Sequence, residues 1–123
     1  MKKRVLCPER LRKVPSQFSW IDHRLVRENY FIRCEHSAWA LYLFLVSVAD
    51  VDGLSYYSDA SLMRRLKMDS VQLSASRQQL LQVGLIAYEK PLCQILNLDP
   101  IQQTRSGQVS VAEILRKALG GQP

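Results

Sequence analysis

The chain has 123 residues, 47% of them hydrophobic, and a formal net charge of +6. This length and composition fit one domain with a real core and exclude a globally disordered chain. The positive charge favours an anionic partner, such as nucleic acid or a membrane surface.

The positive charge is concentrated at the N-terminus. Residues 1–13, MKKRVLCPERLRK, carry a charge of +5, whereas the remaining 110 residues carry only +1. We therefore expect a basic arm over residues 1–17, which could neutralise DNA phosphates or enter a minor groove. A disordered solubility tail is the alternative. The arm residues predicted to contact the DNA backbone are Lys2, Lys3, Arg4, Arg10, Arg12 and Lys13.

Three widely separated cysteines, Cys7, Cys34 and Cys93, match no paired spacing. The basic N-terminus runs into Pro8 and further charge, so we expect no secretory signal. Reduced thiols and a cytoplasmic location are the resulting expectation. The most apolar segment, residues 38–49, has 12 residues. A membrane helix needs about 20, so this segment predicts a core helix and no membrane partner.

A short extended entry followed by a short helix is expected over residues 18–31. Ser37 is the candidate N-cap of the apolar helix that follows. That helix is apolar on nearly every face, so other elements should enclose it. The aromatic residues expected in the core are Trp20, Trp39, Tyr42 and Phe44.

A turn, a small strand and two helices come next. The turn is predicted at residues 50–53, and the short apolar run over 54–57 predicts the strand. Ser58 is the candidate N-cap of the first helix, and Asp69 of the second. Gly84 ends the second helix. The inward positions of that helix are predicted to be Leu73, Ser76, Leu80 and Val83.

The C-terminal third begins with a predicted hairpin. Two strand-like runs, LIAYE and CQILNL, are hinged at residues 90–92. Residues 100–109 are polar and predict a linker. Residues 110–121 predict an amphipathic helix, in which Ser110 and Glu113 form a capping box. The apolar stripe of this helix predicts docking onto a protein partner or self-association.

This order of elements is typical of a winged helix-turn-helix: helix, small strand, helix, short turn, helix, hairpin. We therefore predict an α+β fold, mainly α, with the winged domain over residues 18–99. One face of the third helix would be free to enter a major groove. The residues predicted to contact bases are Ser70, Gln72, Ser74, Arg77 and Gln78, with Ala75 on the same face. The predicted backbone contacts outside the arm are Arg64, Arg65, Lys67 and Lys90.

The segment from SAWALYLFLVSVADVDG to SRQQLLQVGLIAYEK resembles the winged-helix domains of plasmid, phage and transposon replication or transposition proteins. The resemblance extends over roughly residues 18–98. It implies double-stranded DNA binding, no catalysis and no cofactor. The chain departs from that pattern because Arg77 is the single basic residue of its third helix and Lys90 that of its wing. Phosphate contacts dominate DNA affinity, and this scaffold has few basic residues to make them.

No motif predicts an enzyme or a metal site. Cys34 and His36, with the other cysteines or His23, do not have the spacing of zinc ligands. The turn at residues 50–53 lacks the later ligands of a calcium loop. Asp22 and His23 have no nucleophile placed near them by any motif. We therefore expect a protein without catalysis, metal or cofactor.

Two functions from different classes remain. The resemblance and the basic arm favour a DNA-binding protein tied to a mobile element, replication or transcription regulation. The alternative is a winged-helix protein-interaction module, acting as a non-catalytic accessory subunit. The small net charge of residues 14–123 favours that alternative.

Overall fold

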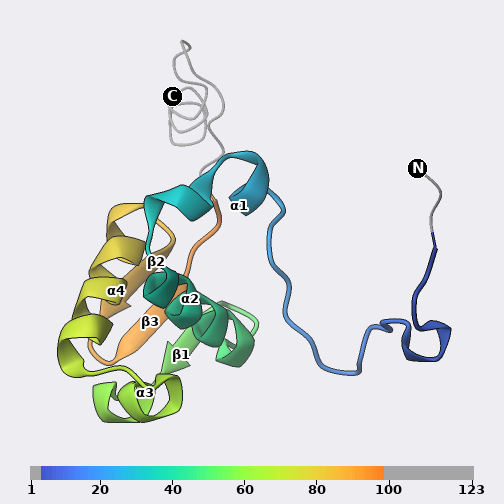
Figure 1. Ribbon diagram of the computed structural model, residues 1–123. Coiled ribbons are helices and arrows are strands. Elements are labelled where there is room, and N and C mark those ends of the chain that lie inside the picture. Colours follow the sequence, from blue (N-terminus) through green and yellow to red (C-terminus); the bar gives the residue numbers. More distant parts are fainter. Residues whose placement is uncertain (1–3, 99–123) are drawn as a thin grey trace, which may run out of the picture.

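The computed structural model describes residues 4–98 (Figure 1). Over these residues it contains four α-helices and one three-stranded antiparallel sheet. The prediction of a mainly helical α+β fold is therefore confirmed. Lys2, Lys3, the expected linker at 100–109 and the expected helix at 110–121 lie outside the described residues.

The N-terminal arm, with residues 18–20 that continue it, does not pack on the domain. Residues 4–20 are exposed throughout, and Figure 1 shows them running away from the helices. Trp20 lies on this arm and is 69% exposed, so its assignment to the core was wrong. The arm leads into helix α1 (Arg24–Arg27), which confirms an extended entry followed by a short helix. Asp22 holds the start of α1, because its Oδ1 accepts a hydrogen bond from the Arg24 amide at 2.9 Å.

The next helix, α2 (His36–Val48), begins two residues earlier than its sequence suggested. Glu35 occupies the N-cap position, and no side chain caps the helix, so the prediction of Ser37 as N-cap was wrong. Ser37 instead accepts a hydrogen bond from the hydroxyl of Ser76 at 2.8 Å. Ser76 is fully buried. This bond therefore satisfies a polar group in the core, where an unpaired hydroxyl would be costly.

Helix α2 is central but is not enclosed on every side, contrary to its apolar pattern. Leu43 is 55% exposed, and Ala40 and Ser47 are exposed on the same face. The reason is that α2 packs mainly against α4 and the sheet, which cover the opposite face. Trp39 and Phe44 are partly buried against the core, and Tyr42 is buried within it.

Three elements follow: strand β1 (Leu54–Tyr56), helix α3 (Asp59–Leu66) and helix α4 (Ser70–Gln82). Both predicted caps are confirmed. The Ser58 hydroxyl accepts from the Ser61 amide at 3.1 Å, and Asp69 Oδ1 accepts from the Gln72 amide at 2.7 Å. Such caps satisfy amides that have no partner within the helix. Figure 1 shows α3 lying across the N-terminal end of α4.

The hairpin consists of β2 (Ile86–Glu89) and β3 (Leu92–Ile95), joined by Lys90 and Pro91. The strand order is β1-β3-β2, so β3 is the central strand and β1 pairs with its free edge. The predicted turn before β1 is confirmed, and Gly53 has a φ of +85°. A Cβ at this position would stand 2.9 Å from the Ile95 carbonyl oxygen, which explains the glycine.

A continuous leucine core joins the helices to the hairpin. Leu41 of α2, Leu73 and Leu80 of α4, and Leu85 before β2 are each at most 1% exposed. The expected inward phase of α4 is confirmed at Leu73, Ser76 and Leu80. Between residues 4 and 98, no helix has both the length and the apolar character needed to cross a membrane.

Candidate nucleic-acid interface

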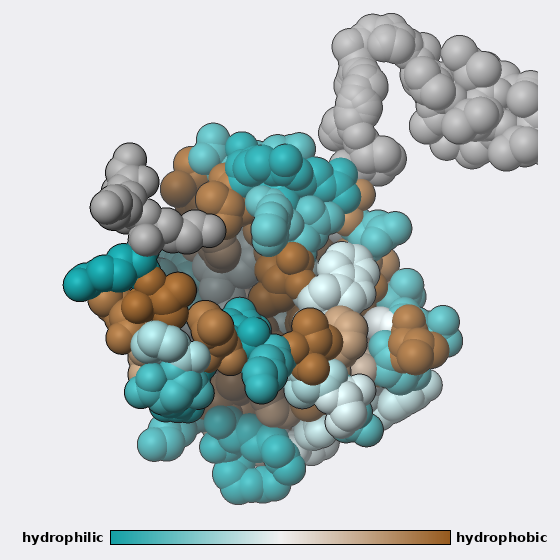
Figure 2. Space-filling model, turned by 90° about the vertical axis from the view of Figure 1, so that its right-hand side faces the viewer, coloured by the Kyte–Doolittle hydropathy of each residue, from teal (hydrophilic) through white to brown (hydrophobic). Residues whose placement is uncertain are grey.

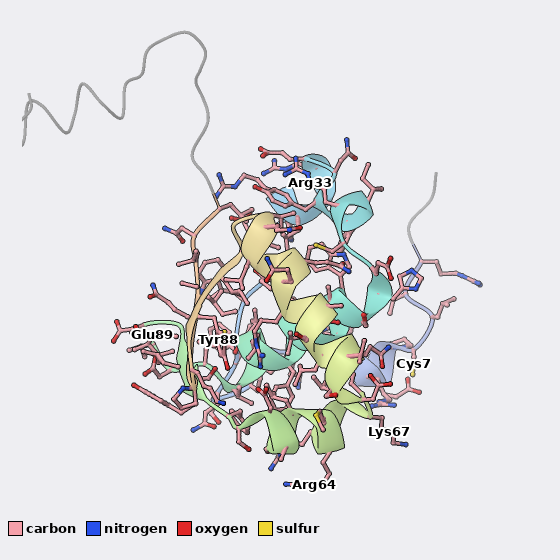
Figure 3. The ribbon with its side chains drawn as sticks, turned by 90° about the vertical axis from the view of Figure 1, so that its left-hand side faces the viewer. Cys7, Arg33, Arg64, Lys67, Tyr88 and Glu89 are labelled. Carbon is pink, nitrogen blue, oxygen red and sulfur yellow. The ribbon has the colours of Figure 1, made fainter. Side chains whose placement is uncertain are left out.

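Helix α4 presents one open face. In Figure 3 it crosses the front of the domain with no other segment drawn over it. Four of the five side chains predicted to contact bases are exposed on α4, namely Ser70, Gln72, Ser74 and Gln78. Ala75, expected on the same face, is exposed as well.

Two further residues belong to this face and were missed from the sequence. Val71 is 76% exposed, and Gln82 is exposed at the C-terminal end of the helix. The helical phase could have found both. With Leu73, Ser76 and Leu80 directed inward at 3.6 residues per turn, positions 71, 75, 78 and 82 follow the opposite face.

Arg77, the fifth predicted base contact, is not on the open face. Its side chain is only 13% exposed, and its Nη2 donates to Asp59 Oδ1 at 2.7 Å. Its guanidinium carbon lies 4.1 Å from the centroid of the Tyr88 ring. Arg77 therefore joins the start of α3, the middle of α4 and strand β2. The expectation that Arg77 points outward on the free face was wrong, because the ion pair and the ring hold it inward.

This arrangement predicts a structural role for Arg77. We expect Arg77→Ala to lower the free energy of unfolding by about 1–2 kcal/mol. The lost pair with half-exposed Asp59 contributes up to about 1 kcal/mol, and the lost stacking on Tyr88 a similar amount. Urea titrations of both single variants and of the double variant with Asp59→Ala measure the coupling. Additive losses would show that the two side chains do not interact.

Basic side chains flank the N-terminal end of α4. Arg64, Arg65 and Lys67 are exposed at the C-terminal end of α3, as predicted. Figure 3 shows Lys67 beside the start of α4, and Arg64 projecting from α3 on the side away from α4. Arg65 also lies 5.7 Å from the Tyr57 ring centroid. Lys90 is exposed at the hairpin loop. These cations could contact the two phosphate strands that border a groove.

The folded domain itself is electrically balanced. Residues 18–98 contain eight Lys and Arg and eight Asp and Glu. Arg24 is held by Asp22 at 2.8 Å, and Arg77 by Asp59. The hydrogen bonds from Arg24 also lower the pKa of the Asp22 carboxyl. Net attraction to an anion must therefore come from local clusters and from the exposed arm residues Arg4, Arg10, Arg12 and Lys13.

The cysteines are not arranged as a metal site. Cys7 is exposed on the arm, whereas Cys34 and Cys93 are buried and unbonded. Burial raises the pKa of both buried thiols, which keeps them protonated and unreactive. Over the described part of the chain, no three His, Cys, Asp or Glu side chains gather closely enough to hold a metal ion.

Apolar residues are exposed away from α4 as well. Figure 2 shows apolar and polar side chains mixed over the face opposite to α4. The exposed aromatic residues of the arm are Phe18 and Trp20, at 65% and 69%. Phe31 is 47% exposed and packs edge-on against Trp39, with 4.8 Å between ring centroids.

Comparison with known proteins gives no match for this chain among family models, curated proteins or solved structures.

Proposed function

We propose that this chain is a non-catalytic winged helix-turn-helix protein that binds double-stranded DNA. Helix α4 enters the major groove, and Arg64, Arg65 and Lys67 contact phosphates beside it. Lys90 on the hairpin and the N-terminal arm contact the backbone elsewhere. The resemblance to replication and transposition proteins supports a role with a mobile element, in replication or in transcription control.

The observation that carries this proposal is the open polar face of α4 with free cations at its start. A major groove is about 12 Å wide and admits one α-helix. The sheet order β1-β3-β2, with the hairpin directly after α4, also supports the winged arrangement.

The arm can take part even though it leaves the domain on the side away from α4. Its expected 17 residues span up to about 55 Å when extended, at about 3.3 Å per residue. A compact domain of about 80 residues has a radius of gyration of about 12 Å, so the arm is long enough to pass around it.

The phosphate contacts are tested by removing single charges. We expect Arg64→Ala and Lys67→Ala each to weaken binding to all duplexes alike. Each should also reduce the slope of log K against log salt by about 0.9, because one counterion-releasing contact is lost. The measurement is a fluorescence titration on a random-sequence duplex at several salt concentrations.

Arg27→Ala is the matched control. Arg27 is exposed on α1, at the far end of the domain from α3. Its removal changes the net charge by the same amount, so its binding should stay close to wild type. Equal losses for all three variants would mean that total charge matters and that α3 has no particular contact with DNA.

One set of observations favours a protein-interaction module as the second candidate. Residues 18–98 have no net charge, Arg77 is engaged internally, and Phe18 and Trp20 stand exposed on an extended arm. An extended segment with exposed aromatic residues is a common form of protein ligand. Under this function the arm would bind a partner protein. Any binding of a DNA duplex would be that expected from the charge of the arm alone, and it would not depend on the duplex sequence.

A further inference from the structure

The open face of α4 has no charged side chain. Its exposed residues offer amides, hydroxyls and methyl groups only. Along the helix, Val71, Ala75, Gln78 and Gln82 follow one stripe, since successive members are three or four residues apart. Ser74 borders this stripe, and Ser70 and Gln72 lie on its flanks.

This chemistry lacks the usual reader of guanine. Arginine and lysine recognise guanine because two donors meet its N7 and O6 acceptors. The one arginine of α4, Arg77, is paired with Asp59 and stacked on Tyr88. Arg64 and Lys67 precede the helix, at the C-terminal end of α3, where phosphates and not base edges would lie.

The same chemistry matches an A·T pair. In the major groove adenine offers an acceptor at N7 and a donor at N6, and thymine offers a C5-methyl group. A glutamine amide can donate to N7 and accept from N6 at once. Small apolar side chains such as Ala75 and Val71 can pack against the thymine methyl. Gln78 and Ala75 are neighbours on the stripe, so they can meet one A·T step together.

We infer that α4 reads A·T base pairs in the major groove, through Gln78 to adenine and through Val71 and Ala75 to thymine methyl groups. This inference rests on the proposed DNA-binding function and adds the class of sequence that the helix selects.

The test uses the full chain and duplexes of equal length that differ only in a central A·T or G·C block. We expect wild type to prefer the A·T block by about 10-fold or more, in line with one good base contact. Gln78→Ala should remove most of this preference while leaving affinity for the G·C block nearly unchanged. Gln94→Ala, at an exposed position of β3, is the matched control and should keep the preference.

Uracil in place of thymine separates the major groove from the minor groove. This exchange removes the C5-methyl group and leaves the minor-groove edge unchanged. We expect wild type to lose a few-fold in affinity for the uracil duplex, Val71→Ser to lose less, and the double variant Val71→Ser with Ala75→Ser to be indifferent to the exchange. An A·T preference that survives both uracil and Gln78→Ala would overturn the inference, because the arm in the minor groove would then be the reader.

The outcomes distinguish this inference from the proposed function. Binding with equal affinity for both blocks, or with preference for G·C, overturns the reading by α4 and leaves DNA binding intact. Absence of binding to every duplex at low salt overturns both.

Discussion

Deletion of residues 2–13 is expected to weaken binding to every duplex alike and to flatten its salt dependence. The arm contributes +5 of the +6 net charge, and its described residues are all exposed and run away from the helices. Each phosphate contact that is lost lowers the salt slope by about 0.9. The deleted segment has six basic residues, so the slope of log K against log salt should fall by roughly 5 at most.

The control for this deletion is an arm with the same composition and a shuffled order. If charge acts without defined geometry, the shuffled arm should restore both the affinity and the salt slope. A loss confined to one preferred duplex would contradict this account, because it would mean that the arm reads sequence in the minor groove.

Comparing the arm with the domain decides between the two proposed functions. If arm deletion abolishes binding while Arg64→Ala, Lys67→Ala and Gln78→Ala have no effect, the helices do not touch DNA. The folded domain would then be a scaffold for protein contacts, and the arm a non-specific electrostatic tether. If arm deletion and the substitutions in α3 and α4 each weaken binding, and their free-energy losses add, both regions contact DNA. Additivity is expected because the effects of distant sites are independent.

The features predicted correctly from the sequence depend on local chemistry. Ser58 and Asp69 cap their helices because a side-chain oxygen meets an amide three residues on. Gly53 and Gly84 take positive φ angles that other residues rarely adopt. The inward phase of α4 followed from the spacing of Leu73, Ser76 and Leu80. In each of these features the residues that interact are close in sequence, so the feature can be predicted without knowing the fold.

The features predicted wrongly depend on distant partners. Arg77 looked free because neither Asp59, 18 residues earlier, nor Tyr88 on the hairpin is near it in sequence. Ser37 looked like a cap because its true partner, Ser76, is 39 residues away. Trp20 and Leu43 are exposed because no other element of the domain covers them. The apolar pattern of a segment does not show whether another element will cover it.

The candidate site was therefore predicted in outline, but Arg77 was wrongly included and Val71 and Gln82 were missed. The exposed polar residues of α4 and the cations of α3 followed from helical phase and amphipathic pattern. The removal of Arg77 from that face changes its chemistry, from a guanine reader among amides to amides and methyl groups alone. That change is the basis for expecting A·T selection.

Leu80→Ala is expected to lower the free energy of unfolding by about 2–5 kcal/mol, the typical cost of emptying a closed leucine site. Leu80 is 0% exposed. Its carbonyl also accepts the Leu85 amide at 3.0 Å, so it lies where α4 turns into the hairpin. Because a domain of this size is stable by only about 5–15 kcal/mol, the variant could be partly unfolded before denaturant is added.

Two companion variants keep the measurement of Leu80 interpretable. Leu80→Met conserves volume and should cost less than about 1.5 kcal/mol. Val71→Ala removes a side chain that is 76% exposed on the same helix, so it should change stability by less than about 0.5 kcal/mol. Urea melts followed by circular dichroism give all three values. A cost for Leu80→Ala as small as that of Val71→Ala would mean that α4 has the opposite phase, with Val71 buried and the amide face turned inward. The polar face proposed to enter the groove would then not exist.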